Sequence, residues 1–294
     1  MDSKKYDIVK NNKGFIAALD QSGGSTANAL KLYGIDSDQY NTDEEMFNLV
    51  HRMRSRVIKS NSFTSEHILG VILFKRTMDS MIDDKYTADY LWNQKKIVSF
   101  LKIDNGLDVL SNGVQLMKPM PELDNLLNLA LERNIFGTKM RSVIKEYNEE
   151  GIRSVVEQQF VIAKQIFAKG LVPIIEPEVD INAVNKEKCE GFLKSEINKH
   201  LENIDPSMKI MFKFTIPAKD NFYEEYTKHP NVVRVVALSG GYPRDIANEK
   251  LEKNRGVIAS FSRALLEGLN VNQTEEEFDS YLLSSIKSIY EASK

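Results

Sequence analysis

Eight short apolar runs typical of β-strands recur along the chain, and segments with helical periodicity lie between them. The runs are FIAALD (15–20), ILGVILF (68–74), SFLKID (99–104), IFGTKMR (135–141), LVPIIEPEV (171–179), KIMFKFTIP (209–217), VVRVVALSG (232–240) and GVIASFS (256–262). Strands that alternate with helices pair in parallel through right-handed crossovers. Eight such units suit either a closed (β/α)8 TIM barrel or an open, doubly wound sheet. The pattern therefore predicts an α/β fold, and by itself it favours the barrel only slightly.

Two of the intervening segments carry clear helix signals. In residues 149–170, apolar side chains recur at a spacing of three to four, and Gly170 follows where a C-cap glycine is expected. A second helix should begin after Thr42, a good N-cap residue that acidic side chains follow. No stretch rich in proline, glycine or charge divides the chain, so residues 1–294 are predicted to form a single domain.

Charged side chains stand on one face of several predicted strands. Side chains alternate faces along a strand, so Lys213 points away from the face that Phe212 and Phe214 share. The same phase applies to eight charges at or near the carboxyl ends of five strands: Asp20, Lys102, Asp104, Lys139, Arg141, Glu176, Glu178 and Lys213.

Each charge alone could be a strand-end residue in water or one half of a structural ion pair. Together, the eight are better explained by a polar cluster whose charges compensate one another, because unpaired buried charge costs several kcal/mol. The active sites of TIM barrels lie at the carboxyl ends of the strands. We therefore predict a TIM-barrel enzyme with its active site at that rim.

Two glycine-rich loops follow predicted strands and could bind phosphate through backbone amides and hydroxyls. They are DQSGGSTANAL (20–30) and LSGGYPRDIANEKL (238–251), and their candidate ligands are Ser22, Ser25, Ser239, Gly240 and Gly241. Pro243 is expected at the first position of a helix, and Arg263 at the end of the eighth strand. Glycine loops are often only turns, but two of them beside a lysine-rich rim suggest a substrate phosphorylated at both ends.

Composition narrows the remaining function classes. The net charge of −3 argues against a nucleic-acid or membrane-surface binder, and no apolar run approaches the length of a membrane span. The first residues lack the apolar core of a signal peptide, so a soluble, cytoplasmic protein is expected. Cys189, the single cysteine, is expected to be an incidental thiol on a helix surface. No two histidines have metal-ligand spacing, so no metal site is expected. Neither glycine loop matches the dinucleotide fingerprint or the Walker motif, so no cofactor is expected either.

Covalent catalysis by a lysine is therefore the leading hypothesis for the chemistry. Lys213 lies between apolar residues and shares its predicted cavity with Lys139. Burial and a neighbouring like charge both favour the neutral, nucleophilic amine.

The motifs together resemble class I fructose-1,6-bisphosphate aldolase, the metal-independent Schiff-base type, in its shorter bacterial branch. The resemblance covers essentially the whole chain in order, through GFIAALDQSGGS, GVILF, FLKIDNG, GTKMR, VPIIEPE, the strand with Lys213, LSGGYPR and SFSRAL. It implies reversible cleavage of fructose 1,6-bisphosphate into dihydroxyacetone phosphate and glyceraldehyde 3-phosphate, in glycolysis and gluconeogenesis.

The resemblance also implies residue roles. Lys213 would form the Schiff base, Glu176 would serve as acid and base, and Asp20 would orient and deprotonate the substrate hydroxyls. Lys139 would stabilise the intermediates and keep Lys213 neutral, with Arg141 and Glu178 in support. The ketone-side phosphate would meet Ser239, Gly240, Gly241, the backbone of Ser262, and Arg263, and the distal phosphate would meet Ser22, Ser25 and Lys102.

Several positions depart from the animal enzymes of this family. Gln21 replaces an acidic residue, Met140 a tryptophan, and Ser262 a glycine, while Lys75 and Arg76 replace a histidine–glutamate pair. The sequence stops at YEASK, without the long tail whose terminal tyrosine assists proton transfer in animal aldolases. The group that protonates the enamine therefore stays open, and a homo-oligomer is possible without animal-type contacts being implied.

Three other functions remain open at this point. A related lysine aldolase could prefer tagatose 1,6-bisphosphate or sedoheptulose 1,7-bisphosphate, because stereochemistry at one hydroxyl leaves no sequence mark. Transaldolase-like activity is less favoured, since two phosphate loops exceed what its substrates need. A binding protein without activity is disfavoured by the intact set of Lys213, Lys139, Glu176 and Asp20.

Overall fold

The computed structural model describes residues 2–22 and 24–294, apart from the side chains of residues 24 and 25. Eight strands pair in parallel, each with the next one along the chain. They are β1 (Phe15–Leu19), β2 (Ile68–Leu73), β5 (Val98–Lys102), β7 (Gly137–Ile144), β8 (Val172–Val179), β9 (Ile210–Thr215), β10 (Val232–Leu238) and β11 (Val257–Ala259). The N–H of Ala18 donates to the carbonyl of Phe261, 3.1 Å away, and so brings the last strand to the first. The predicted (β/α)8 TIM barrel is confirmed, and the open sheet is excluded.

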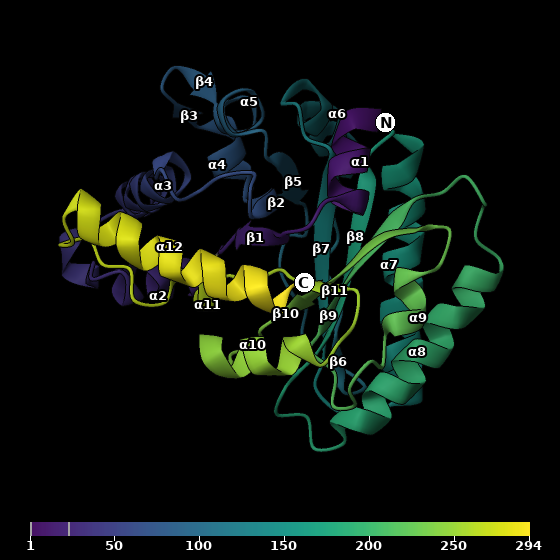
Figure 1. Ribbon diagram of the computed structural model, residues 1–294. Helices are drawn as coiled ribbons and strands as arrows, with labels where there is room; N and C mark the ends of the chain where they lie inside the picture. The colour runs from purple at the N-terminus through teal and green to yellow at the C-terminus, as the bar shows by residue number, and fades with distance from the viewer. Residues whose placement is uncertain (1, 23) are drawn as a thin grey trace.

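Helices follow the strands and cover the barrel, with α7 and α8 on one side and α3 and α12 on the other (Figure 1). The α-helices are α1 (Ser3–Asn11), α2 (Gly24–Leu32), α3 (Asp43–Lys59), α4 (Lys75–Asp79), α5 (Thr87–Tyr90), α6 (Leu123–Glu132), α7 (Glu149–Ala168), α8 (Lys186–Glu202), α9 (Glu224–Thr227), α10 (Arg244–Glu252), α11 (Arg263–Leu266) and α12 (Glu275–Ala292). Short turns of other helix types cover Ser37–Gln39 and Leu91–Lys95, and short strands are β3 (Met81–Ile82), β4 (Lys85–Tyr86) and β6 (Val114–Gln115).

Helix boundaries follow the capping residues in the sequence. Thr42 caps α3 in a capping box with Glu45, as its position predicts. The helix predicted over 149–170 is α7, and Gly170 follows it with a φ of 87°. The sequence places Pro243 at the first position of a helix, but Pro243 lies one residue before α10, because its ψ of 153° is extended.

Most strand boundaries match the predicted runs within about two residues, with differences at two strands. The run predicted over 135–141 is β7, which ends three residues later, at Ile144. The sequence predicts a strand over 256–262, whereas β11 ends at Ala259. The chain still bonds to its neighbours beyond that point, because the N–H of Ser260 donates to the carbonyl of Ala237 at 2.7 Å. It then turns into α11, so Arg263 begins that helix rather than ending a strand.

The barrel interior is apolar along most of its length. Phe100 lies between Gly70 of β2 and Gly137 of β7, where a β-carbon on either glycine would stand 2.9 Å from its ring. Helix α1 lies against the amino end of the barrel, where Val9 is fully buried and the Arg234 side chain donates to its carbonyl at 2.8 Å. The polar cluster must therefore lie at the opposite, carboxyl end.

The outer face of β9 explains the apolar neighbours of Lys213. Phe212 and Phe214 point outward and pack with Phe160 of α7 and the rings of Tyr223 and Tyr226. The alternation predicted for this strand is thus observed, with the lysine on the inward face.

Cys189 corrects a sequence expectation. The thiol is buried in α8 rather than exposed on a helix surface. It shares the apolar stripe of Leu193 and Ile197, one and two turns further along the helix.

Within residues 2–22 and 24–294, no helix is both long enough and apolar enough to cross a membrane.

Candidate active site

A cavity of about 820 Å³ opens at the carboxyl ends of the strands. All eight charged residues expected there line it, and so do Ser22, Ser239, Gly240, Ser262 and Arg263. Gly241 lies just behind this lining, next to the guanidinium of Arg263. The Ser25 side chain lies outside the described part of the chain. The structure therefore brings together side chains from seven separate strand ends or the loops that follow them.

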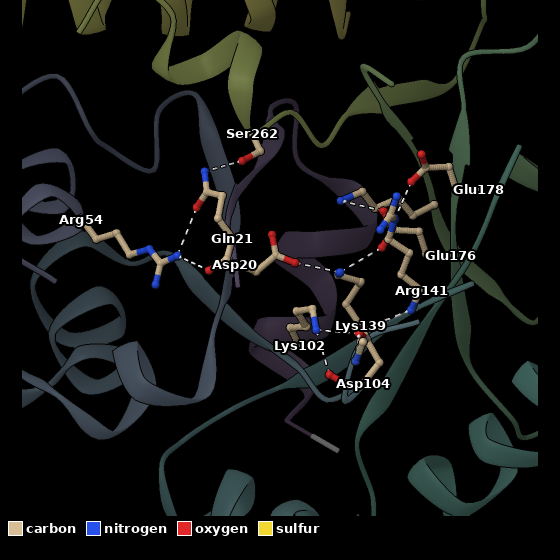
Figure 2. A network of polar contacts seen from close by, with 12 residues as sticks. Asp20, Gln21, Arg54, Lys102, Asp104, Lys139, Arg141, Glu176, Glu178 and Ser262 are labelled. Atoms are coloured by element: carbon tan, nitrogen blue, oxygen red, sulfur yellow. Dashed lines mark hydrogen bonds and ion pairs between the residues drawn. The ribbon is translucent and has the colours of Figure 1, made fainter. Parts of the chain in front are cut away.

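Four buried side chains form a continuous charged chain at the centre, and Figure 2 labels three of them, Asp20, Lys139 and Glu176. The Lys139 ammonium lies 2.7 Å from Oδ2 of Asp20 and 3.0 Å from Oε2 of Glu176. The other oxygen of Glu176 lies 3.2 Å from Nζ of Lys213. Glu176 thus contacts both lysines, one through each carboxylate oxygen.

The pKa values of Asp20 and Lys139 are shifted in opposite directions. Burial by itself would raise the pKa of Asp20, but the Lys139 ammonium, with a smaller contribution from Lys213, outweighs it and holds that pKa well below its usual range. Burial would lower the pKa of Lys139, but the carboxylates of Asp20 and Glu176 outweigh it and raise that pKa well above its usual range. Both groups are therefore charged at neutral pH.

The strands that carry Glu176 and Lys213 separate at these residues. The pairing of β8 with β9 comprises Ile174–Met211 and Ile175–Phe212 and stops there. Instead of a strand neighbour, the side-chain oxygen of Gln159 in α7 accepts the N–H of Glu176 at 2.9 Å. The Gln159 amide in turn donates to Oγ of Ser142 at 3.1 Å, and Gln159 is fully buried. A helix side chain thus replaces the missing ladder bond behind Glu176.

Two further ion pairs surround the central chain. Nε of Arg141 donates to Oε2 of Glu178 at 2.6 Å. Nζ of Lys102 donates to Oδ1 of Asp104 at 2.6 Å and to its backbone carbonyl at 2.8 Å. Asp104 also accepts the backbone N–H of Arg141 at 3.2 Å, which ties the loop after β5 to β7.

The loop after β10 has the open backbone that an anion site needs. Gly240 and Gly241 both have positive φ, 62° and 113°, which favours glycine at these positions. A β-carbon at Gly240 would also lie 2.4 Å from the Ile181 side chain. Ser239, Gly240 and Arg263 therefore present backbone and guanidinium groups to the same end of the cavity.

Two buried polar residues of this site are missed by reasoning from the strands alone. Arg54 of α3 is 1% exposed and Gln159 of α7 is fully buried. Each occupies a position within the apolar stripe of its helix, Arg54 between Met53 and Val57 and Gln159 beside Val156. A polar residue in an apolar stripe is the sequence signal that could have found both.

The arrangement can support amine chemistry on a carbonyl compound. A lysine amine next to a carboxylate can attack a carbonyl carbon while the carboxylate moves protons. The surrounding ammonium and guanidinium groups suit an anionic substrate. Among residues 2–22 and 24–294, no group of three or more His, Cys, Asp or Glu side chains is placed to hold a metal ion.

Comparisons with known proteins agree on one family. A family model described as fructose-bisphosphate aldolase class-I matches residues 2–191. Fructose-bisphosphate aldolase class 1 of Clostridium acetobutylicum is 61% identical over 293 residues, which cover 100% of this chain and 99% of the relative. A solved structure of the Plasmodium falciparum fructose-bisphosphate aldolase, in a ternary complex with TRAP and a small-molecule inhibitor, superposes with a TM-score of 0.75. The superposition covers 99% of this chain and 93% of that one, and at 18% sequence identity it shows a shared fold.

Proposed function

The chain belongs to the class I fructose-bisphosphate aldolase family, and on that premise we propose that Lys213 is the lysine that forms the Schiff base with the substrate. The enzyme reversibly cleaves fructose 1,6-bisphosphate to dihydroxyacetone phosphate and glyceraldehyde 3-phosphate. Fructose bisphosphate is the substrate named by both the family and the relative, which favours it over tagatose 1,6-bisphosphate and sedoheptulose 1,7-bisphosphate.

The choice among the three lysines of the cavity carries this proposal. Lys139 stands between two carboxylates that keep it an ammonium, which has no lone pair for attack. Lys102 is engaged twice by Asp104. Lys213 contacts one oxygen of Glu176 at the longer distance of 3.2 Å, and it lines the cavity. Lys213 is therefore the amine that a carbonyl carbon can most readily reach.

Glu176 is the proposed acid and base. It would take the proton that the Lys213 nitrogen loses as the amine adds to the ketone carbon, and then give a proton to the hydroxyl that leaves as water. Lys139 holds the other oxygen of Glu176 at 3.0 Å, which fixes the carboxylate with its first oxygen next to the Lys213 nitrogen. The iminium that results withdraws electrons from the neighbouring carbon–carbon bond.

Cleavage of the C3–C4 bond then needs a carboxylate next to the C4 hydroxyl group of the substrate. Asp20 would accept a hydrogen bond from that hydroxyl and take its proton as the C3–C4 electron pair moves into the iminium to form the enamine. Its depressed pKa keeps Asp20 ionised for this role, and Lys139 holds it in place at 2.7 Å. Arg141 and Glu178 would support the charge balance at the rim.

The two phosphates of the substrate would bind at opposite sides of the cavity. Ser239, Gly240, Gly241, the backbone of Ser262, and Arg263 would bind the ketone-side phosphate, and Ser22, Ser25 and Lys102 the distal one. We further propose that residues 1–294 act as one catalytic domain in the cytoplasm, which membership of a glycolytic family supports. A homo-oligomer stays a prediction, and light scattering would measure it.

Borohydride reduction in the presence of dihydroxyacetone phosphate tests the assignment. It should inactivate the protein and leave one adduct, which peptide mass mapping should place on Lys213, while EDTA leaves cleavage unchanged. An adduct on Lys139, or activity abolished by EDTA, would contradict it. Relative kcat/KM values on the three ketose bisphosphates would establish the substrate preference.

A further inference from the structure

A buried arginine reaches the rim of the cavity from outside the barrel (Figure 2). Arg54 of α3 donates through one terminal nitrogen to Oγ1 of Thr77 at 2.6 Å. Its other terminal nitrogen donates to the backbone carbonyl of Gln21 at 2.7 Å and to the side-chain oxygen of Gln21 at 3.2 Å. The Gln21 amide nitrogen then lies 2.6 Å from Oγ of Ser262. A continuous path thus runs from Arg54 through Gln21 to Ser262 at the cavity wall.

The donors and acceptors along this path allow only one polarity. A guanidinium donates and never accepts, so Gln21 must turn its carbonyl oxygen toward Arg54. The amide nitrogen, which only donates, must then face Ser262, and the Ser262 oxygen must accept. The hydroxyl proton of Ser262 is consequently directed away from Gln21 and is free for another acceptor. Among the described residues, Ser262 Oγ is seen to accept from Gln21, and its hydroxyl is not seen to donate to another group.

The location of Ser262 indicates what the acceptor is. Ser262 lines the cavity together with Ser239, Gly240 and Arg263, at the end assigned above to the ketone-side phosphate. We propose that the Ser262 side-chain hydroxyl donates a hydrogen bond to that phosphate, and that Gln21 and Arg54 are positioning residues that aim it. This inference rests on the proposed function and adds a side-chain donor to a residue otherwise expected to bind through its backbone.

The identity of residue 21 sets the direction of the hydroxyl. A carboxylate at this position would accept from Arg54 and also from Ser262, so the Ser262 proton would turn toward residue 21. Ser262 would then present lone pairs to the phosphate, and the carboxylate would add a like charge nearby. Gln21 and Ser262 are therefore expected to act as a pair, although they lie 241 positions apart in the chain.

The test compares ligands with and without the phosphate. Ser262→Ala should weaken the binding of dihydroxyacetone phosphate about tenfold or more, which is the loss expected for a hydrogen bond to a charged group. Gln21→Met should weaken the binding of dihydroxyacetone phosphate about threefold to tenfold. Ser262→Thr, which keeps the hydroxyl, should retain most of the affinity that Ser262→Ala loses. In every variant, the rate at which dihydroxyacetone forms its trapped adduct should fall much less than the affinity for dihydroxyacetone phosphate. Ser154→Ala, on the exposed face of α7, is the matched control.

Coupling between the two residues is the second readout. The double variant Gln21→Met with Ser262→Ala should bind dihydroxyacetone phosphate no more weakly than Ser262→Ala alone. Additive losses, or equal losses for dihydroxyacetone, would overturn the proposal. Arg54→Met should reproduce Gln21→Met, and if that variant fails to fold, the Gln21 and Ser262 variants decide.

Calorimetry keeps this test separate from the Schiff-base assignment. The Kd of dihydroxyacetone phosphate can be measured without trapping any adduct. If wild-type protein forms no adduct on Lys213, the assignment of the nucleophile fails. A phosphate-specific effect of Ser262→Ala on that Kd would still support the role of Ser262, and its absence would refute it.

Discussion

Glu176 and Lys213 face each other across the gap where β8 and β9 stop pairing. Their strands pair through Ile175 and Phe212, and the next residue on each strand is the charged one. The side chains then meet with Nζ of Lys213 3.2 Å from Oε1 of Glu176. The separation gives both side chains room inside the barrel, and Gln159 satisfies the backbone N–H that it exposes.

Replacing Gln159 by Met should therefore impair both stability and catalysis. The change keeps the volume but leaves the Glu176 N–H and the Ser142 hydroxyl without their partner. We expect the free energy of unfolding, measured in urea, to fall by about 1–3 kcal/mol, the cost of an unsatisfied buried polar group. We also expect kcat to fall more than KM changes. Gln165→Met, on the exposed side of α7, should alter neither, and equal effects of both variants would argue against a specific role.

Lys213→Met should fold but lose turnover. Its long apolar side chain fills the same space without an amine, so no borohydride adduct should form with dihydroxyacetone phosphate. Circular dichroism would check the fold, and a coupled assay would measure cleavage. Lys219→Met, an exposed position shortly after the same strand, serves as the control. Substantial activity in Lys213→Met would mean that another lysine is the nucleophile.

The stability of the folded protein should fall at low pH because Asp20 becomes protonated. The folded-state pKa of Asp20 is depressed, so its contribution is complete above the unfolded value of about 3.9 and is lost as the pH falls further. The pKa of Lys139 is raised, so its contribution is complete below about 10.4 and is lost only at higher pH. These two groups should therefore give a flat stability profile between about pH 4 and pH 10.

Lys139→Met tests this profile. Removing the ammonium leaves two buried carboxylates without their shared partner, at a cost of about 3–5 kcal/mol near neutral pH. Protonation of Asp20 should then begin at higher pH, because its main source of stabilisation is gone. Urea unfolding from pH 3 to pH 8 would measure both effects. An acid limb identical to that of wild type would show that Lys139 does not control Asp20.

The Cys189 thiol should be nearly inert in the folded protein. Burial raises its pKa, with a further contribution from Glu190, and it has no exposed surface for a reagent to reach. Ellman's reagent should react slowly with native protein and at once with protein unfolded in urea, releasing one equivalent per chain. Fast reaction under native conditions would contradict the buried position.

Much of the site could be predicted because strand geometry links sequence position to direction. The period of two places Lys213 opposite Phe212 and Phe214, and parallel strands bring their carboxyl ends to one edge. That reasoning does not reach Arg54 and Gln159, which arrive from helices and meet partners far along the chain.

Local composition also misled one expectation. The residues around Cys189 are polar, but their side chains point to other sides of α8, and only the stripe shared with Leu193 and Ile197 faces the core. The contact between Gln21 and Ser262 was likewise out of reach, because it depends on how the first and last strands meet.

The junction of β1 and β11 has a consequence for motion. In the described part of the chain these two strands share no ladder, and the bond from Ala18 to Phe261 joins them. Asp20 and Gln21 leave one side of this junction, while Ser262 and Arg263 leave the other. A substrate bound by residues from both sides would connect β1 and β11 at this junction. Substrate binding and local opening of the junction would then be thermodynamically linked. The amide of Ala18 should then exchange its hydrogen more slowly as the cavity fills.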